Sequence, residues 1–147
     1  MDKKIIIGVG IIVLILIAVF AVKPKNNTIN NIDSTGAEKV QVFLFHATQR
    51  CPTCIRIGQL AKATVEERFS EQLKSGKIEF REINIDLPEN KTLAEKFQAG
   101  GSALFINAIK NGQDSIVEDT IVWQLASGYE VNFKNYLSNK INNILGI

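Results

Sequence analysis

The distribution of apolar residues divides this chain into an apolar segment, a polar segment and a folded domain. Residues 5–22 form an uncharged apolar run of eighteen residues, which as a helix would span ~27 Å, close to the thickness of a bilayer core. Residues 23–38 are rich in Asn, Ser, Thr, Lys and Gly and hold too few apolar side chains to pack. The pattern predicts an N-terminal tail at 1–4, a transmembrane anchor at 5–22, a flexible linker at 23–38 and one domain at 39–147.

The alternative to an anchor is a cleaved signal peptide. Lys3 and Lys4 would supply its positive end, and Val19-Phe20-Ala21 is a poor cleavage site because small residues are favoured at both key positions. The apolar run is also longer than the ~7–15 residues of a usual signal core. We therefore expect a single-pass protein of the cell membrane. Either interpretation places residues 39–147 outside the cytoplasm.

Within the domain, the period of the apolar positions alternates between that of strands and that of helices. Val40–Phe45 is a β-branched and aromatic run typical of a buried strand. From Cys51-Pro52 the apolar residues recur every four positions as far as Ser75-Gly76, which predicts one long helix. A second strand is expected at 77–85 and a short helix at 91–98.

The rest of the domain completes an α/β pattern. Residues 103–106 predict a strand, and Asn111-Gly112 is a strong hairpin signal that leads into one or two strands over 114–122. The segment 133–145 is an amphipathic helix. The order β-α-β-α-β-β-α implies a parallel first pair with a right-handed crossover. We expect a mixed central sheet with flanking helices.

Charge adds little to this picture. The formal net charge is +2, and no basic stripe predicts binding to nucleic acid, so no nucleic-acid partner is expected.

Candidate chemistry is concentrated in FHATQRCPTC, which holds both cysteines and the single histidine. Cys51 and Cys54 lie where a predicted strand gives way to a helix, and the N-terminus of a helix favours a thiolate over a thiol. We expect Cys51 to be the attacking nucleophile and Cys54, one turn further, to be the resolving thiol. Arg50 is expected to stabilise the thiolate, and His46 is a possible proton shuttle or only the polar end of a strand.

Other uses of the cysteine pair remain open. Zinc is disfavoured, because a zinc site usually has four ligands and only His46 could join the two thiolates without carboxylates. Cys51 and Cys54 could bind a soft ion such as Cu(I). They could also form a permanent structural disulfide in a tethered interaction domain.

The sequence resembles a known family. The run INIDLPENKTLAEKFQAGGSALFINAIKNGQ, together with the first strand and CPTC, is similar to thioredoxin over about residues 39–145. FHATQRCPTC and VWQLASGYE resemble, more specifically, membrane-anchored thioredoxin-like proteins labelled as nitroreductase subunits of the ArsF type. The resemblance implies a thioredoxin-like fold and thiol–disulfide exchange, with a protein thiol or disulfide as partner. A membrane redox protein is expected to be that partner, and no cofactor is expected, because no flavin or nicotinamide fingerprint is present.

Three departures from thioredoxin concern the site. Thioredoxins have a cis-proline before the third strand, where this chain has Gly100-Gly101-Ser102. The tryptophan before the first cysteine is replaced by Gln49-Arg50, and Gln41 and Phe43 leave no carboxylate in the first strand. The missing proline favours binding of Cu(I) or a trivalent metalloid such as As(III) as the alternative function. Because this acid is missing, ionisation of the cysteine pair would depend on Arg50, on the helix N-terminus and on His46.

Overall fold

The computed structural model describes residues 36–147, so the predicted anchor at 5–22 and almost all of the predicted linker lie outside the described residues. Its strands are β1 (Lys39–His46), β2 (Ile78–Asn84), β3 (Ala103–Lys110) and β4 (Gln113–Glu118). Its helices are α2 (Pro52–Arg68), α3 (Ser70–Lys74), the short 3₁₀ helix η1 (Pro88–Asn90), α4 (Lys91–Phe97), α5 (Ile121–Leu125) and α6 (Glu130–Leu145).

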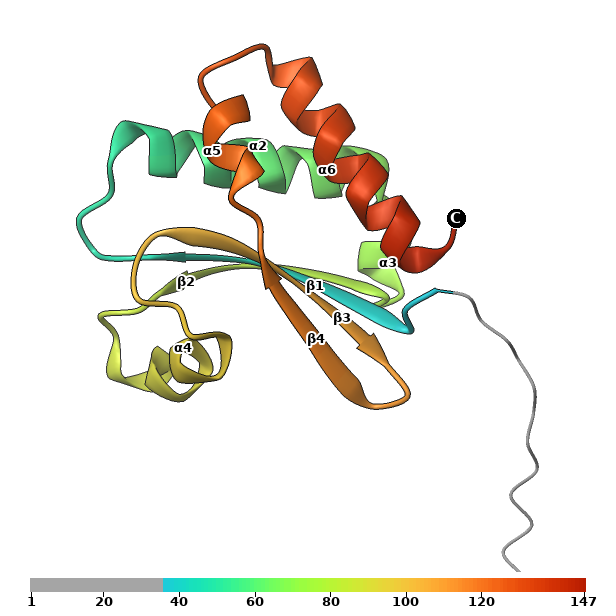
Figure 1. The fold of residues 1–147 in the computed structure, drawn as a ribbon, viewed down its shortest axis with the longest axis horizontal. Helices are drawn as coiled ribbons and strands as arrows, with labels where there is room; N and C mark the ends of the chain where they lie inside the picture. The colour runs from blue at the N-terminus through green and yellow to red at the C-terminus, as the bar shows by residue number, and fades with distance from the viewer. Residues whose placement is uncertain (1–35) are drawn as a thin grey trace, which may run out of the picture. The chain divides into compact units, whose positions relative to one another are not determined.

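The four strands form one mixed sheet in the order β2-β1-β3-β4. β1 and β2 are parallel, and the connection between them runs through α2 and α3 (Figure 1). β3 lies antiparallel to β1, and β4 lies antiparallel to β3. The tight turn between β3 and β4 contains Asn111 and Gly112 with φ of 52° and 71°, which is the left-handed geometry favoured in two-residue hairpins.

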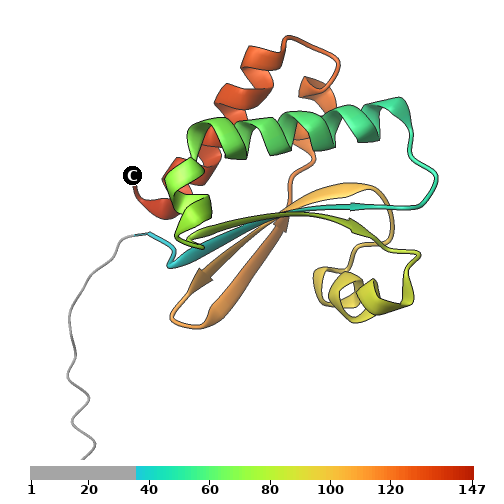
Figure 2. The same ribbon diagram turned by 180° about the vertical axis from the view of Figure 1, so that it is seen from behind.

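Strand β1 lies inside the sheet and is buried on both faces. Helices α2, α3, α5 and α6 lie on one side of the sheet, and α4 lies on the other, as both views show (Figures 1 and 2). Val40, Val42 and Leu44 face the larger helical layer, whereas Phe43 and Phe45 face α4. This placement explains why the sequence of β1 is apolar without alternation.

The structure confirms the predicted α/β fold with a mixed four-stranded sheet and flanking helices. Within residues 36–147, none of the helices combines the length and the apolar character needed to cross a membrane.

The single long helix predicted from Cys51-Pro52 to Ser75-Gly76 is wrong, because the chain forms two helices there. Phe69 separates α2 from α3 with φ −133° and ψ 30°, outside helical geometry. Its side chain is buried in the larger core, while its amide still donates to the Val65 carbonyl. The spacing of apolar residues continued across the break, so the pattern could not reveal it.

The strand predicted over 114–122 is correct only for its first part, because residues 121–125 form α5. The change occurs at Asp119, whose amide donates to the Leu104 carbonyl and whose buried carboxylate accepts from the Ile121 amide. Tyr136 and Lys140 of α6 also donate to this carboxylate. Asp119 therefore ends the strand pairing and starts α5 at one position.

The aromatic cluster under α4 gives a test of the fold. The Phe97 ring centroid lies 5.3 Å, 5.2 Å and 5.8 Å from those of Phe43, Phe45 and Phe105. Phe97→Ala should lower the free energy of unfolding by about 3–5 kcal/mol, because it removes a buried ring and leaves a cavity. Urea unfolding followed by Trp123 fluorescence measures the loss, with the exposed Tyr129→Ala as the control. A loss below about 1 kcal/mol would show that α4 does not depend on this cluster.

Candidate functional site

The two cysteines lie at the start of α2, directly after the loop that follows β1. Cys51 occupies the N-cap position with extended backbone angles, φ −74° and ψ 156°, and Pro52 is the first helical residue. The Cys51 sulfur accepts a hydrogen bond of 3.0 Å from the Cys54 amide. The sulfur thus performs the role of an N-cap side chain, and the predicted helix start at Cys51-Pro52 is confirmed.

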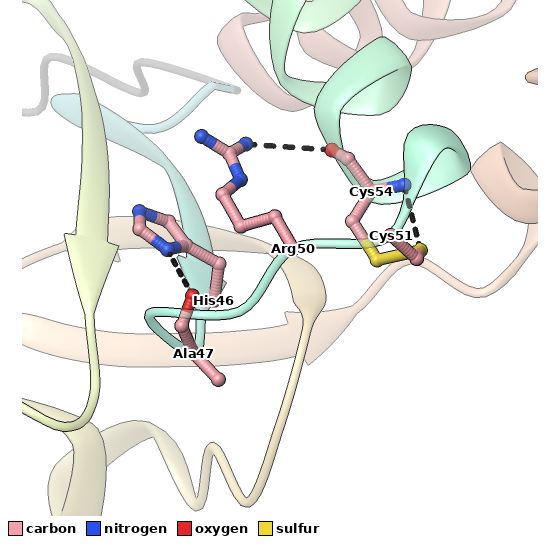
Figure 3. The surroundings of a disulfide bond; sticks show 5 residues. All are labelled: His46, Ala47, Arg50, Cys51 and Cys54. Atoms are coloured by element: carbon pink, nitrogen blue, oxygen red, sulfur yellow. Dashed lines mark hydrogen bonds between the residues drawn. A yellow bond between two sulfur atoms is a disulfide. The ribbon is translucent and has the colours of Figure 1, made fainter.

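Cys51 and Cys54 form a disulfide with their Cα atoms 5.1 Å apart (Figure 3). Cys51 is exposed, whereas only 6% of Cys54 is accessible to solvent. A second protein can therefore reach the first sulfur more readily than the second. This asymmetry is what exchange through a mixed disulfide requires.

Arg50 precedes the disulfide and pairs with the next element of the sheet. Its Nη1 lies 2.7 Å from a Glu82 carboxylate oxygen of β2, and its Nη2 lies 3.4 Å from the Cys54 carbonyl oxygen. In Figure 3 the guanidinium points at that carbonyl and not at the sulfur atoms. Glu82 was not among the residues predicted from the sequence, since its position depends on the register of β2 beside β1.

His46 ends β1, and its half-buried ring lies with Nδ1 2.9 Å from the Ala47 carbonyl oxygen. Figure 3 shows the ring on the far side of the Arg50 side chain from the disulfide. Among the described residues, no hydrogen bond joins this ring to either cysteine. The proposed proton shuttle therefore has no direct contact with the sulfurs in this arrangement.

The loop before Cys51 is held by residues that follow β2. The Thr48 amide donates to an Asp86 carboxylate oxygen at 2.7 Å, and the Asn84 side-chain amide donates to the Thr48 hydroxyl at 3.0 Å. The hydrogen bond from the Thr48 backbone lowers the pKa of Asp86 below its ordinary value. The sequence offered one signal for this contact, since the carboxyl ends of parallel strands meet at one edge of a sheet.

The Gly100-Gly101-Ser102 segment lies at the same end of the sheet. Phe45 pairs with Ala103, so the residues before β3 continue past the end of β1 where the site loop begins. A Cβ added at Gly100 or Gly101 would meet no atom within 4 Å. All peptide bonds of residues 36–147 are trans. Side chains larger than hydrogen could therefore be accommodated at both glycines.

The two cysteines have no further metal-binding side chains grouped with them among residues 36–147. In the part of the chain that the structure describes, no three His, Cys, Asp or Glu side chains are grouped so that they could hold an ion. Only Cys51 and Cys54, once reduced, offer a pair of soft ligands.

Comparison with known proteins finds similar solved structures, while no family model and no curated protein matches the chain. A thioredoxin from Thermus thermophilus is 18% identical over 71% of this chain and 76% of its own, with a TM-score of 0.45. Thioredoxin from Fasciola hepatica is 19% identical over 70% and 82%, with a TM-score of 0.41. An uncharacterised thioredoxin-like protein from Clostridium perfringens is 14% identical over 81% and 92%, with a TM-score of 0.45.

The Asp86–Thr48 contact predicts a pH dependence of the site loop. Because the pKa of folded Asp86 lies below 3.8, its stabilising contribution is present above that pH and is lost as the pH falls through the lower, folded value. The Thr48 amide resonance in NMR should therefore shift in one step with a midpoint below 3.8. Asp86→Asn should abolish the step, and Glu89→Gln should leave it unchanged. A Thr48 resonance that does not titrate would contradict the contact.

Proposed function

We propose that this protein is a membrane-tethered thiol–disulfide oxidoreductase that acts outside the cytoplasm through Cys51 and Cys54. The observation that carries the proposal is the exposed Cys51 sulfur at the N-cap of α2, beside a nearly buried Cys54. A disulfide that only stabilises the fold needs no such exposure of one sulfur atom. The resemblance to thioredoxin in the sequence supports the same function.

The helix start favours the chemistry in two ways. The free amides and the dipole at the N-terminus of α2 stabilise negative charge at Cys51. The Cys54 amide already donates to the Cys51 sulfur in the disulfide form, and the same donor would form a stronger, charge-assisted bond to a thiolate. Cys51 should therefore ionise more readily than an ordinary thiol, whose pKa is about 8.5.

The exchange proceeds in two balanced steps. The Cys51 thiolate attacks a partner disulfide, forms a mixed disulfide and releases one partner thiolate, which takes up a proton. The Cys54 thiol then loses its proton to solvent, and the resulting thiolate attacks the Cys51 sulfur, forms the disulfide seen in the structure and releases the second partner thiolate, which also takes up a proton. The partner gains two electrons and the dithiol loses two. The same two steps in reverse oxidise a partner dithiol.

The tether determines which partners are available. Residues 5–22 have the length and the apolar composition of a membrane span, so the domain would act close to the membrane surface. We propose a membrane redox protein as the partner that resets Cys51 and Cys54. The exchange itself requires no cofactor, because the electrons move between sulfur atoms.

The second candidate function is capture of Cu(I) or a trivalent metalloid by the reduced cysteine pair. The observation that favours it is the exposed Cys51 beside Cys54, two soft ligands with Cα atoms 5.1 Å apart, together with Gly100 and Gly101 where thioredoxins have a proline. Titration of the reduced chain with Cu(I) separates the two candidates. Tight one-to-one binding that survives competition by glutathione would favour capture.

Trapping of mixed disulfides tests the oxidoreductase function directly. In membranes that contain the full chain, Cys54→Ser should accumulate a covalent complex with the partner, because no second thiol resolves it. Cys51→Ser should trap little, since Cys54 is nearly buried. Non-reducing electrophoresis with mass spectrometry measures both. Equal trapping by the two variants, or none with either, would contradict the proposed roles, and a disulfide that resists mild reduction would indicate a structural bond.

A further inference from the structure

We propose that Glu82, paired with the Arg50 guanidinium against the first turns of α2, offsets the positive charge of Arg50 and so makes the cysteine pair less oxidising than Arg50 alone would. The inference rests on the proposed function, because it assigns the control of that exchange to an ion pair. Neither cysteine is part of this pair. Arg50 and Glu82 act on the sulfurs only through their charges, which lie at the first turn of α2.

The contacts of the pair join the site loop, β2 and α2. Arg50 is adjacent to Cys51 in the chain, and its guanidinium bridges the Glu82 carboxylate and the Cys54 carbonyl at 2.7 Å and 3.4 Å. Only 21% of the Arg50 side chain and 31% of the Glu82 side chain are accessible to solvent. A partly buried pair is screened less than a surface pair, so its charges act on the nearby sulfurs.

Gly58 provides the space in which the pair lies. A Cβ at this position would lie 2.7 Å from Leu44 Cδ2 and 3.0 Å from Arg50 Nη2, and it would lie 3.4 Å from Glu82 Oε1. Any larger residue would therefore push Leu44 or the guanidinium away. The absence of a side chain one turn after Cys54 lets the guanidinium lie against the helix.

One buried donor of Arg50 has no partner. Within residues 36–147 its Nε makes no hydrogen bond, and an unpaired buried donor is unfavourable. A pair selected only for stability gains nothing from this unpaired donor. Reduction of the disulfide creates negative sulfur within the same few residues, and a guanidinium with a free donor can respond to that charge without leaving Glu82.

The other charged groups at this end of the fold are engaged elsewhere. Arg56 of α2 donates to the carbonyls of Ala126 and Gly128. The Asp86 carboxylate binds the Thr48 amide, and the His46 ring contacts the Ala47 carbonyl. Glu130 of α6 pairs with Lys134. Arg50 is next to Cys51 in the chain and donates to the Cys54 carbonyl, so the Arg50–Glu82 pair is the ion pair that contacts the cysteine segment directly.

The two charges should act in opposite directions. A cation stabilises the thiolate of the reduced form and makes the disulfide more oxidising, whereas an anion does the reverse. Over the distance of a few residues, and with partial screening, each charge is expected to change the equilibrium constant with glutathione by about three- to tenfold.

The experiment equilibrates the full chain in detergent with mixtures of reduced and oxidised glutathione. Glu82→Gln should lower the constant for forming the disulfide by about three- to tenfold, and Arg50→Gln should raise it by about as much. The double variant should return to within about twofold of the parent, because the two charges cancel. Each difference should diminish in 1 M salt, where the Debye length is about 3 Å.

A matched control is present on the same strand. Glu79 of β2 pairs with Lys39 of β1 at 2.7 Å and its side chain is 30% accessible, but this pair lies at the other end of β1. Glu79→Gln should leave the constant unchanged. A purely structural role for Arg50 and Glu82 would shift both single variants and the double variant in one direction, which would overturn the inference.

A second measurement separates this inference from the proposed function. If the parent chain shows no reversible couple with glutathione, the proposed function fails. The pH titration of thiolate absorbance in the reduced chain then decides the inference by itself. Glu82→Gln should move the titration to lower pH and Arg50→Gln to higher pH, and coincident titrations would overturn the electrostatic role.

Discussion

The arrangement of this domain depends on the burial of β1 inside the sheet. Its residues pack against helices on both faces, with Val42 and Leu44 on one side and Phe43 and Phe45 on the other. A strand in this position must pair on both edges, and it does so with β2 and β3. Because β2 is parallel to β1, the chain has to cross the sheet between them, and the crossover begins directly after β1. That beginning is the cysteine site.

The same constraint assembles the surroundings of the cysteines. β1 and β2 are parallel, so their C-terminal ends lie at the same end of the sheet. Thr48 therefore contacts Asp86, and Arg50 contacts Glu82. The antiparallel β3 starts at this end of the sheet, so Gly100 and Gly101, which precede it, also lie there. One end of the sheet therefore brings together the exposed Cys51, the Arg50–Glu82 pair and the Gly100-Gly101 segment.

The sequence was informative where local chemistry determines structure. The apolar run of β1, the Cys51-Pro52 helix start and the Asn111-Gly112 turn each follow from neighbouring residues, and each is present. Phe69 and Asp119 were missed because tertiary contacts interrupt a regular pattern there.

The residues of the site could be predicted only in part. Cys51 and Cys54 could be identified from their place in the pattern, whereas Glu82 could not, because its contact with Arg50 depends on strand register. The placement of the Arg50 guanidinium at a carbonyl follows from Gly58, whose effect on packing is invisible in the sequence. The segment 5–22 lies outside the described residues, and the anchor there stays a prediction.

The proposed function requires that the N-cap position make Cys51 the reactive thiol of the pair. The most direct measurement is the rate at which each cysteine of the reduced full chain is alkylated, followed by mass spectrometry across pH. Cys51 should be labelled at least about tenfold faster than Cys54 below pH 7, since a helix N-terminus lowers a thiol pKa by one or more units. Equal rates, or faster labelling of Cys54, would contradict the proposed role of Cys51.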